Sequence, residues 1–176
     1  MDTAVVGLSG TVVGVVGTLA TTRLGGTEQR RTQNDQSARQ ERATAYTKLV
    51  TACSRTYRLG YAVHVAVQDT HGRAEASPGV AEASPGVAER LQEFSLAVES
   101  AREVVSLVKL HGPEEIARAA DNLVSAMSGW YREVAFLAQG EGDVQWAGEA
   151  IELYEELEER FIALGREALS RTPVPA

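Results

Sequence analysis

The feature that most constrains this chain is a stretch of twenty residues without a charged side chain, from Thr3 to Thr22. A helix rises about 1.5 Å per residue, so a helix of this length covers the roughly 30 Å hydrocarbon core of a bilayer. The rest of the chain contains charged residues, and most of it has apolar residues at helical spacing, as a water-soluble helical domain does. The sequence therefore predicts a hydrophobic anchor helix over residues 3–22 that spans a membrane.

Four glycines inside this stretch recur at spacings of three, four and three, which places them on one helical face: Gly7, Gly10, Gly14 and Gly17. A face without side chains lets two helix backbones approach closely, and helices associate in lipid through such small-residue contacts. We call this face the glycine seam. It predicts a homo-oligomer that self-associates through the N-terminal helix.

Other interpretations of residues 3–22 stay open. A secretory signal needs a basic segment at its start, whereas the first Lys or Arg of this chain is Arg23. A Val- and Gly-rich helix or strand buried inside a soluble oligomer fits the preference of valine for strands. A phosphate-binding loop is disfavoured, because the glycines match neither common phosphate-loop motif and no lysine lies among them.

Flanking charge predicts how an anchor is oriented. No basic residue precedes the hydrophobic stretch, and four arginines follow it: Arg23, Arg30, Arg31 and Arg39. The positive-inside rule then gives a single-pass membrane protein with its C-terminal domain in the cytoplasm. The single cysteine, Cys53, agrees with a reducing compartment, and its place on an apolar helix face predicts a buried, unreactive thiol.

Charge is distributed unevenly along the chain, beneath a net charge of −7. Residues 23–73 hold nine Lys and Arg against four acidic residues, a net of +5, and residues 74–176 hold eight against nineteen, a net of −11. The basic part, next to the predicted anchor, suits an anionic lipid surface at about 1 kcal/mol per well-placed cation. The acidic part argues against nucleic acid as a partner.

Beyond the anchor, apolar periodicity predicts an all-α chain. Gly25-Gly26 is a helix-ending or flexible step, after which Thr27 can cap a polar helical stalk over residues 27–44. Residues 45–170 contain four segments with apolar residues at steps of three and four, which predicts an antiparallel four-helix bundle. The predicted core positions are Tyr46, Leu49, Cys53, Tyr57, Gly60, His64 and Val67, then Leu91, Phe94, Val98, Ala101, Val105 and Val108, then Ile116, Ala120, Leu123, Met127, Trp130, Val134 and Leu137, and finally Ala147, Ile151, Tyr154, Leu157, Phe161, Leu164 and Ala168.

Turn residues mark the boundaries between these segments, and the first segment is predicted to end between Asp69 and Gly72. The heptapeptide AEASPGV occurs twice in succession over residues 74–87, which predicts a surface loop or a helix start at Ser-Pro. Gly112-Pro113 ends the second segment, and Pro113 opens the third. Residues 140–142 end the third, Asp143 can cap the fourth, and residues 171–176 form a tail.

Catalytic and metal-binding patterns are missing from the sequence. A di-metal helical bundle needs Glu-x-x-His pairs, and none is present, nor is there a G-x-S-x-G nucleophile motif. His64 has no second ligand three or four residues away, which favours a structural role. We therefore expect no enzyme activity, no cofactor and no metal.

Glutamates concentrate on the fourth segment, where four of them share one face: Glu149, Glu152, Glu156 and Glu159. This face can be solvated and partly neutralised by arginines such as Arg160 and Arg166, or it can be an acidic docking surface for an unidentified basic protein partner. Trp130, Tyr131 and Trp146 can likewise be core residues or include an exposed anchor for a partner.

The layout of residues 5–49 has a short glycine-rich span followed by the Arg- and Gln-rich segment RRTQNDQSARQERATAY. It resembles uncharacterised actinobacterial proteins with a glycine-rich N-terminal transmembrane helix followed by a cytoplasmic helical domain. The resemblance implies the anchor and the topology. It implies no catalytic, cofactor-binding or metal-binding residue.

Three hypotheses of function follow. The first is a membrane-anchored, non-enzymatic interaction or scaffold module that self-associates through the glycine seam and presents its bundle to a protein partner. The second is a membrane-active effector or pore-forming subunit, which would release dye from liposomes. The third is a soluble homo-oligomer whose N-terminal helices form a buried hydrophobic assembly or lipid-binding element, which would need no detergent.

Overall fold

The structure is a computed structural model that describes the backbone of residues 3–76 and 85–170 and the side chains of residues 29–70 and 86–170. Its described backbone consists of four helices and contains no strand, which confirms the predicted all-α class. The helices are α1 (Thr3–Ala76), α2 (Pro85–His111), α3 (Glu114–Ala138) and α4 (Val144–Ser170). The chain divides into two compact units, residues 1–40 and residues 41–176.

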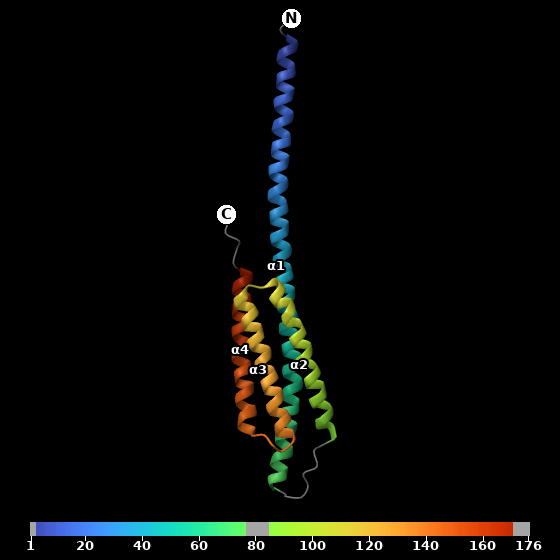
Figure 1. Cartoon of the computed structure of the whole chain (residues 1–176), viewed down its shortest axis with the longest axis vertical. Coiled ribbons are helices and arrows are strands. Elements are labelled where there is room, and N and C mark those ends of the chain that lie inside the picture. The colour runs from blue at the N-terminus through green and yellow to red at the C-terminus, as the bar shows by residue number, and fades with distance from the viewer. Residues whose placement is uncertain (1–2, 77–84, 171–176) are drawn as a thin grey trace. The chain divides into compact units, whose positions relative to one another are not determined.

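The second unit is a helical bundle in which α2, α3, α4 and the part of α1 from Glu41 onward surround one apolar core (Figure 1). Residues that touch run in opposite order along neighbouring helices, so the chain direction alternates from helix to helix. The pairs are Lys109 with Asp121 and Arg102 with Ser128 between α2 and α3, and Tyr46 with Phe161 and Tyr57 with Tyr154 between α1 and α4.

Turn chemistry fixes two of the connections. α3 starts directly after Pro113, which stands at the N-cap, one residue before its predicted place inside the helix. After α3, Gly140 adopts a φ of +79°, a region that glycine enters without strain. The N–H groups of Gly140 and Glu141 donate to the carbonyls of Leu137 and Phe136 at 3.1 and 3.0 Å, the Schellman arrangement. Both breaks occur where the sequence predicted them.

The core is closed by aromatic rings around Trp130. Tyr57, Phe94 and Tyr154 surround its indole with ring centroids 5.8, 5.1 and 6.2 Å away. Gly60 permits this packing, because a Cβ at that position would lie 2.6 Å from Phe94 Cζ and from Trp130 Cη2. The seven predicted core positions of α3 are all buried. On α4, Ala147, Tyr154 and Phe161 are buried, whereas the other predicted positions are partly buried and pack against the core: Ile151, Leu157, Leu164 and Ala168, like Tyr57 of α1 and Leu91 of α2.

α1 is longer than predicted. The sequence favoured a break at Gly25-Gly26 and an end between residues 69 and 72, but the helix runs through both and ends at Ala76. A glycine inside a helix costs about 1 kcal/mol, so two glycines weaken the helix without requiring it to stop. Residues 29–44, within the predicted stalk, contain no buried residue, and Ala45 is the first buried position among the described residues.

The predicted anchor at residues 3–22 and its glycine seam lie outside the residues whose side chains are described. Among the described residues, no helix is both long and apolar enough to cross a membrane. The repeat at residues 74–87 contributes its first three residues to α1 and its last three to α2, which begins at Pro85 as a Ser-Pro helix start would. Its remaining residues, and the tail at residues 171–176, are outside the described part.

Candidate functional site

The orientation of α4 follows from its cap and its core face. The carboxylate of Asp143 accepts a hydrogen bond from the backbone N–H of Gln145 at 2.7 Å, as the sequence predicted for a helix start. Ala147, Tyr154 and Phe161 are buried in the bundle core. Because these three residues recur at steps of seven, they fix one side of α4 inward and the opposite side toward solvent.

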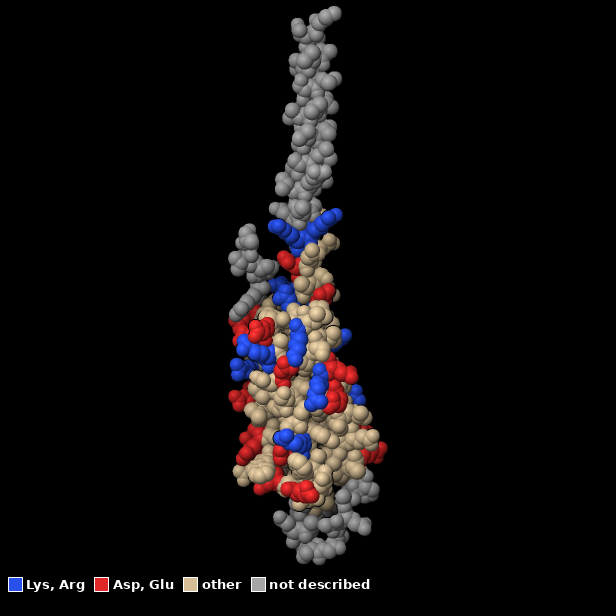
Figure 2. All heavy atoms as spheres, in the orientation of Figure 1, with Lys and Arg blue, Asp and Glu red and all other residues tan. Residues whose placement is uncertain are grey.

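The solvent side of α4 is the predicted acidic face, and all four of its members are exposed: Glu149, Glu152, Glu156 and Glu159. Figure 2 shows acidic side chains at several heights along the edge of the bundle that α4 forms. α4 contains seven glutamates and two arginines, a net charge of −5. Like charges four residues apart on a helix repel each other by about 0.2–0.5 kcal/mol per pair.

Neighbouring basic residues do not neutralise this face through ion pairs in the described part of the chain. None of the ion pairs seen among the described residues includes Glu152, Glu156 or Glu159. Glu149 accepts a hydrogen bond from Gln145 Nε2 at 2.9 Å. The donor is an uncharged amide, so this contact does not balance the charge of the carboxylate. The acidic face therefore keeps its charge available to solvent or to a partner.

An apolar groove lies between α3 and α4, beside the acidic face. It has a volume of about 710 Å³ and is lined by residues that include Ala126, Gly129, Glu133, Trp146, Glu149 and Leu153. Trp146 and Leu153 are 60% and 51% exposed. Trp146 is thus the exposed aromatic residue of the three considered from the sequence, whereas Trp130 is fully buried.

Sequence reasoning missed this groove. One signal was present: Trp146, Ala150, Leu153 and Leu157 recur at steps of four, three and four, which forms a second apolar stripe that meets the predicted core stripe of α4 at Leu157. The other wall of the groove, on α3, includes small residues. Ala126 and Gly129 carry so little side chain that α3 leaves the space open, and a Cβ added at Gly129 would have no atom within 4 Å.

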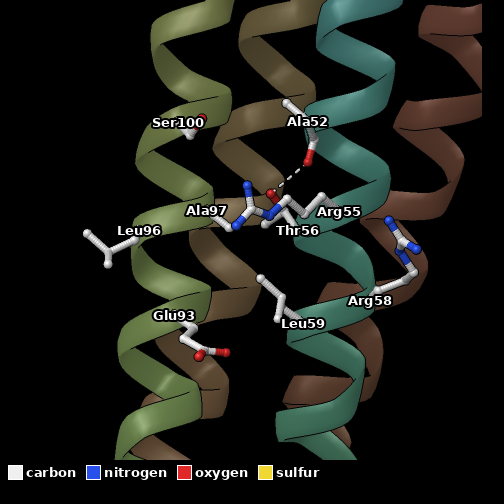
Figure 3. Close-up of a pocket in the computed structure, with 9 residues that line it drawn as sticks. All are labelled: Ala52, Arg55, Thr56, Arg58, Leu59, Glu93, Leu96, Ala97 and Ser100. Atoms are coloured by element: carbon white, nitrogen blue, oxygen red, sulfur yellow. Dashed lines mark hydrogen bonds between the residues drawn. The ribbon is translucent and has the colours of Figure 1, made fainter.

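A second groove, of about 660 Å³, lies between α1 and α2 (Figure 3). Arg55 extends across it from α1, Glu93 lies on α2, and Leu96 points away from it. The hydroxyl of Thr56 donates to the carbonyl of Ala52 at 2.8 Å and is therefore already engaged. Charged side chains of both signs, Arg55, Arg58 and Glu93, line this groove together with small and apolar residues. It lacks the exposed aromatic residue and the adjacent row of like charges that distinguish the groove between α3 and α4.

The bundle interior holds a cysteine and tyrosines with altered acidity. Burial, followed by the charge of Glu158, raises the pKa of the Cys53 thiol to about 12, so the thiol stays protonated at neutral pH. The Tyr57 hydroxyl donates to a Glu155 carboxylate oxygen at 2.8 Å, which, with burial, raises the pKa of Tyr57 to about 12. Burial also raises the pKa of Tyr154. The predicted burial of the Cys53 thiol is confirmed.

Several buried polar atoms have no hydrogen-bond partner among the described residues: Tyr46 OH, His64 Nδ1, Trp130 Nε1 and Tyr154 OH. Two of them, Trp130 and Tyr154, are neighbours in the aromatic cluster, with ring centroids 6.2 Å apart. Burial lowers the pKa of His64, which favours its neutral form. The described residues contain no group of three His, Cys, Asp or Glu side chains that could hold a metal ion.

The predicted basic residues fall in the first compact unit. Arg30, Arg31 and Arg39 are exposed on α1, whereas the side chain of Arg23 is outside the described residues, as are the surroundings of Gly7, Gly10, Gly14 and Gly17. The two groups that the structure does bring together are the acidic face of α4 and the adjacent apolar groove.

No family model, curated protein or solved structure matches this chain.

Proposed function

We propose that this protein is a non-enzymatic helical interaction module. Its bundle presents the acidic face of α4 to a basic protein partner, and its N-terminal stretch anchors the module in a membrane as a single span with the bundle in the cytoplasm. The glycine seam joins copies of the anchor into an oligomer. The bundle recognises the partner, and the anchor holds the bundle at the membrane surface.

One observation carries the proposal. Glu152, Glu156 and Glu159 are exposed and lie outside every ion pair of the described residues, directly beside exposed Trp146 and Leu153. A row of like charges with large apolar side chains next to it is unfavourable for an isolated domain. A basic partner would relieve both costs, because its charges attract the glutamates and its apolar groups cover the exposed surface.

The non-enzymatic part of the proposal is supported by the chemistry of the residues. The chain has a single cysteine, and its pKa of about 12 makes it a poor nucleophile. The anchor part is supported by the uncharged stretch from Thr3 to Thr22 and by the arginines that follow it.

The test is to capture proteins from the cell extract with three forms of the full-length chain. These are the wild type, a Glu152→Gln/Glu156→Gln/Glu159→Gln variant, and a control with Glu89→Gln and Glu103→Gln, two exposed acids of α2. We expect basic proteins to be captured by the wild type and the control but to be reduced at least fivefold with the α4 variant, increasingly so at low salt. Equal capture by all three forms would contradict the proposal.

A further inference from the structure

The groove between α3 and α4 and the acidic face beside it form one continuous surface. We infer that this surface binds an amphipathic helix of another protein, with its apolar side chains in the groove and its basic side chains along Glu149, Glu152 and Glu156. The inference rests on the proposed function, because it specifies how the basic partner is recognised.

The groove has the geometry that a helix needs. Its α4 wall presents Trp146, Ala150, Leu153 and Leu157 at steps of four, three and four, which is the pattern of a seam between helices. From the first to the last of these residues α4 rises roughly 16 Å, which is the length of three helical turns. A ligand helix with apolar residues at i, i+3, i+4 and i+7 has an apolar span of roughly 10 Å, so it fills about two of these three turns.

The floor of the groove can receive a large side chain. Ala126 and Gly129 form the α3 side, and the space next to Gly129 is open, since an added Cβ there would have no atom within 4 Å. Exposed Trp146 and Leu153 stand on the other side. An aromatic or leucine side chain entering at Gly129 would remove both of them from water, which is how buried anchors stabilise interfaces.

Charge identifies the ligand as basic. Glu149 lines the groove itself, and Glu152 and Glu156 continue the row one and two turns further along α4. On the α3 side, Arg132 lies 3.4 Å from Glu133, so the one basic lining residue is already paired. The potential that a ligand meets is therefore negative.

Two segments of a second copy of this chain fit less well. Pairing α4 with α4 would bring together two helices that each have a net charge of −5. The arginine-rich stretch of α1 at residues 29–42 has the right charge, but its apolar residues are limited to Ala38, which cannot fill the groove. The occupant is therefore a helix of a different chain.

The binding test uses the full-length chain in an uncharged detergent and three fluorescein-labelled synthetic helices of eighteen residues. The first has leucines at i, i+3, i+4 and i+7 with lysines elsewhere, the second has glutamates in place of the lysines, and the third rearranges the first so that it has no apolar face. Fluorescence anisotropy, with detergent alone as the blank, gives each Kd. We expect the first peptide to bind at least tenfold more tightly than either of the others.

Variants of the protein locate the site. Gly129→Phe fills the groove from within, and Trp146→Ala/Leu153→Ala removes its exposed wall; each is expected to weaken binding of the first peptide at least tenfold. The matched control is Leu96→Ala/Leu110→Ala, which truncates two apolar side chains that are 64% and 74% exposed on α2 and should leave the Kd unchanged. Circular dichroism confirms that each variant is folded, because all of these side chains lie outside the core.

The outcomes separate this inference from the proposed function. If Glu152→Gln/Glu156→Gln weakens binding and the groove variants do not, a basic partner binds the acidic face without the groove; the inference is then wrong and the proposed function stands. If neither set has an effect, both are wrong. A groove that binds the glutamate peptide equally well, or one whose Trp146→Ala/Leu153→Ala variant loses self-association in sedimentation, would also overturn the inference.

Discussion

At the scale of single residues, Gly60 determines how closely α1 can approach the aromatic cluster. A Cβ at this position would meet Phe94 Cζ and Trp130 Cη2 at 2.6 Å, closer than two unbonded carbons can lie. Both rings are fully buried, so neither can move aside into solvent. The sequence marked Gly60 as a core position, but it could not show that the absence of a side chain is the reason, because that depends on which rings face it.

We predict that Gly60→Ala destabilises the protein. Overpacking a core costs about 1–3 kcal/mol, whereas alanine gains about 0.5–1 kcal/mol over glycine inside a helix. The difference is a net loss of roughly 0–2.5 kcal/mol, centred near 1 kcal/mol, which should lower the melting temperature by several degrees, measured by circular dichroism at 222 nm.

Gly148→Ala is the matched control for that substitution. Gly148 is also helical, and a Cβ there would have no atom within 4 Å, so only the gain in helix propensity remains. Its melting temperature should rise slightly. A Gly60→Ala variant as stable as Gly148→Ala would contradict the close packing of α1 against the Phe94 and Trp130 rings.

At the scale of helices, boundaries and core faces were the most predictable features. α3 is bounded by Pro113 and Gly140, two residues whose backbones restrict or permit particular conformations, and all its predicted core positions are buried. The ends of α1 were predicted poorly, because Gly25-Gly26 lowers helix propensity without forbidding a helix. The groove was missed for a different reason. It arises where the small residues of α3 face α4, so it depends on the register between two helices.

The start of α4 offers a direct test of a boundary that the sequence predicted. The Asp143 carboxylate accepts the Gln145 N–H at 2.7 Å, and its charge also lies next to the positive end of the helix dipole. Asp143→Ala should therefore reduce the free energy of unfolding by about 1 kcal/mol in urea titrations.

Asp143→Asn separates the two contributions of that cap. Asparagine keeps an oxygen acceptor and loses the charge, so the variant should retain most of the stability that alanine removes. An alanine variant as stable as the wild type would mean that α4 is held by its core face alone.

At the scale of the whole molecule, the chain joins two chemically different parts. The stretch from Thr3 to Thr22 has no charge, and residues 74–176 have a net charge of −11. The proposed function assigns the first part to a membrane and the second to recognition of a basic partner. An anchor that also oligomerises would present several acidic faces together, which raises the avidity for a partner without any new contact.

This arrangement predicts that the glycine seam controls the oligomer while the anchor controls membrane retention. Replacing Gly10 and Gly14 with isoleucine blocks close approach of two helices, yet it makes the stretch more apolar. The Gly10→Ile/Gly14→Ile variant should therefore remain in carbonate-washed membranes but form far fewer crosslinked oligomers than the wild type. Val12→Ile/Val16→Ile, which enlarges side chains away from the seam, is the matched control and should keep them. Oligomers that persist in the glycine variant would exclude the seam as the contact, and a wild-type chain that leaves the membrane during the wash would exclude the anchor itself.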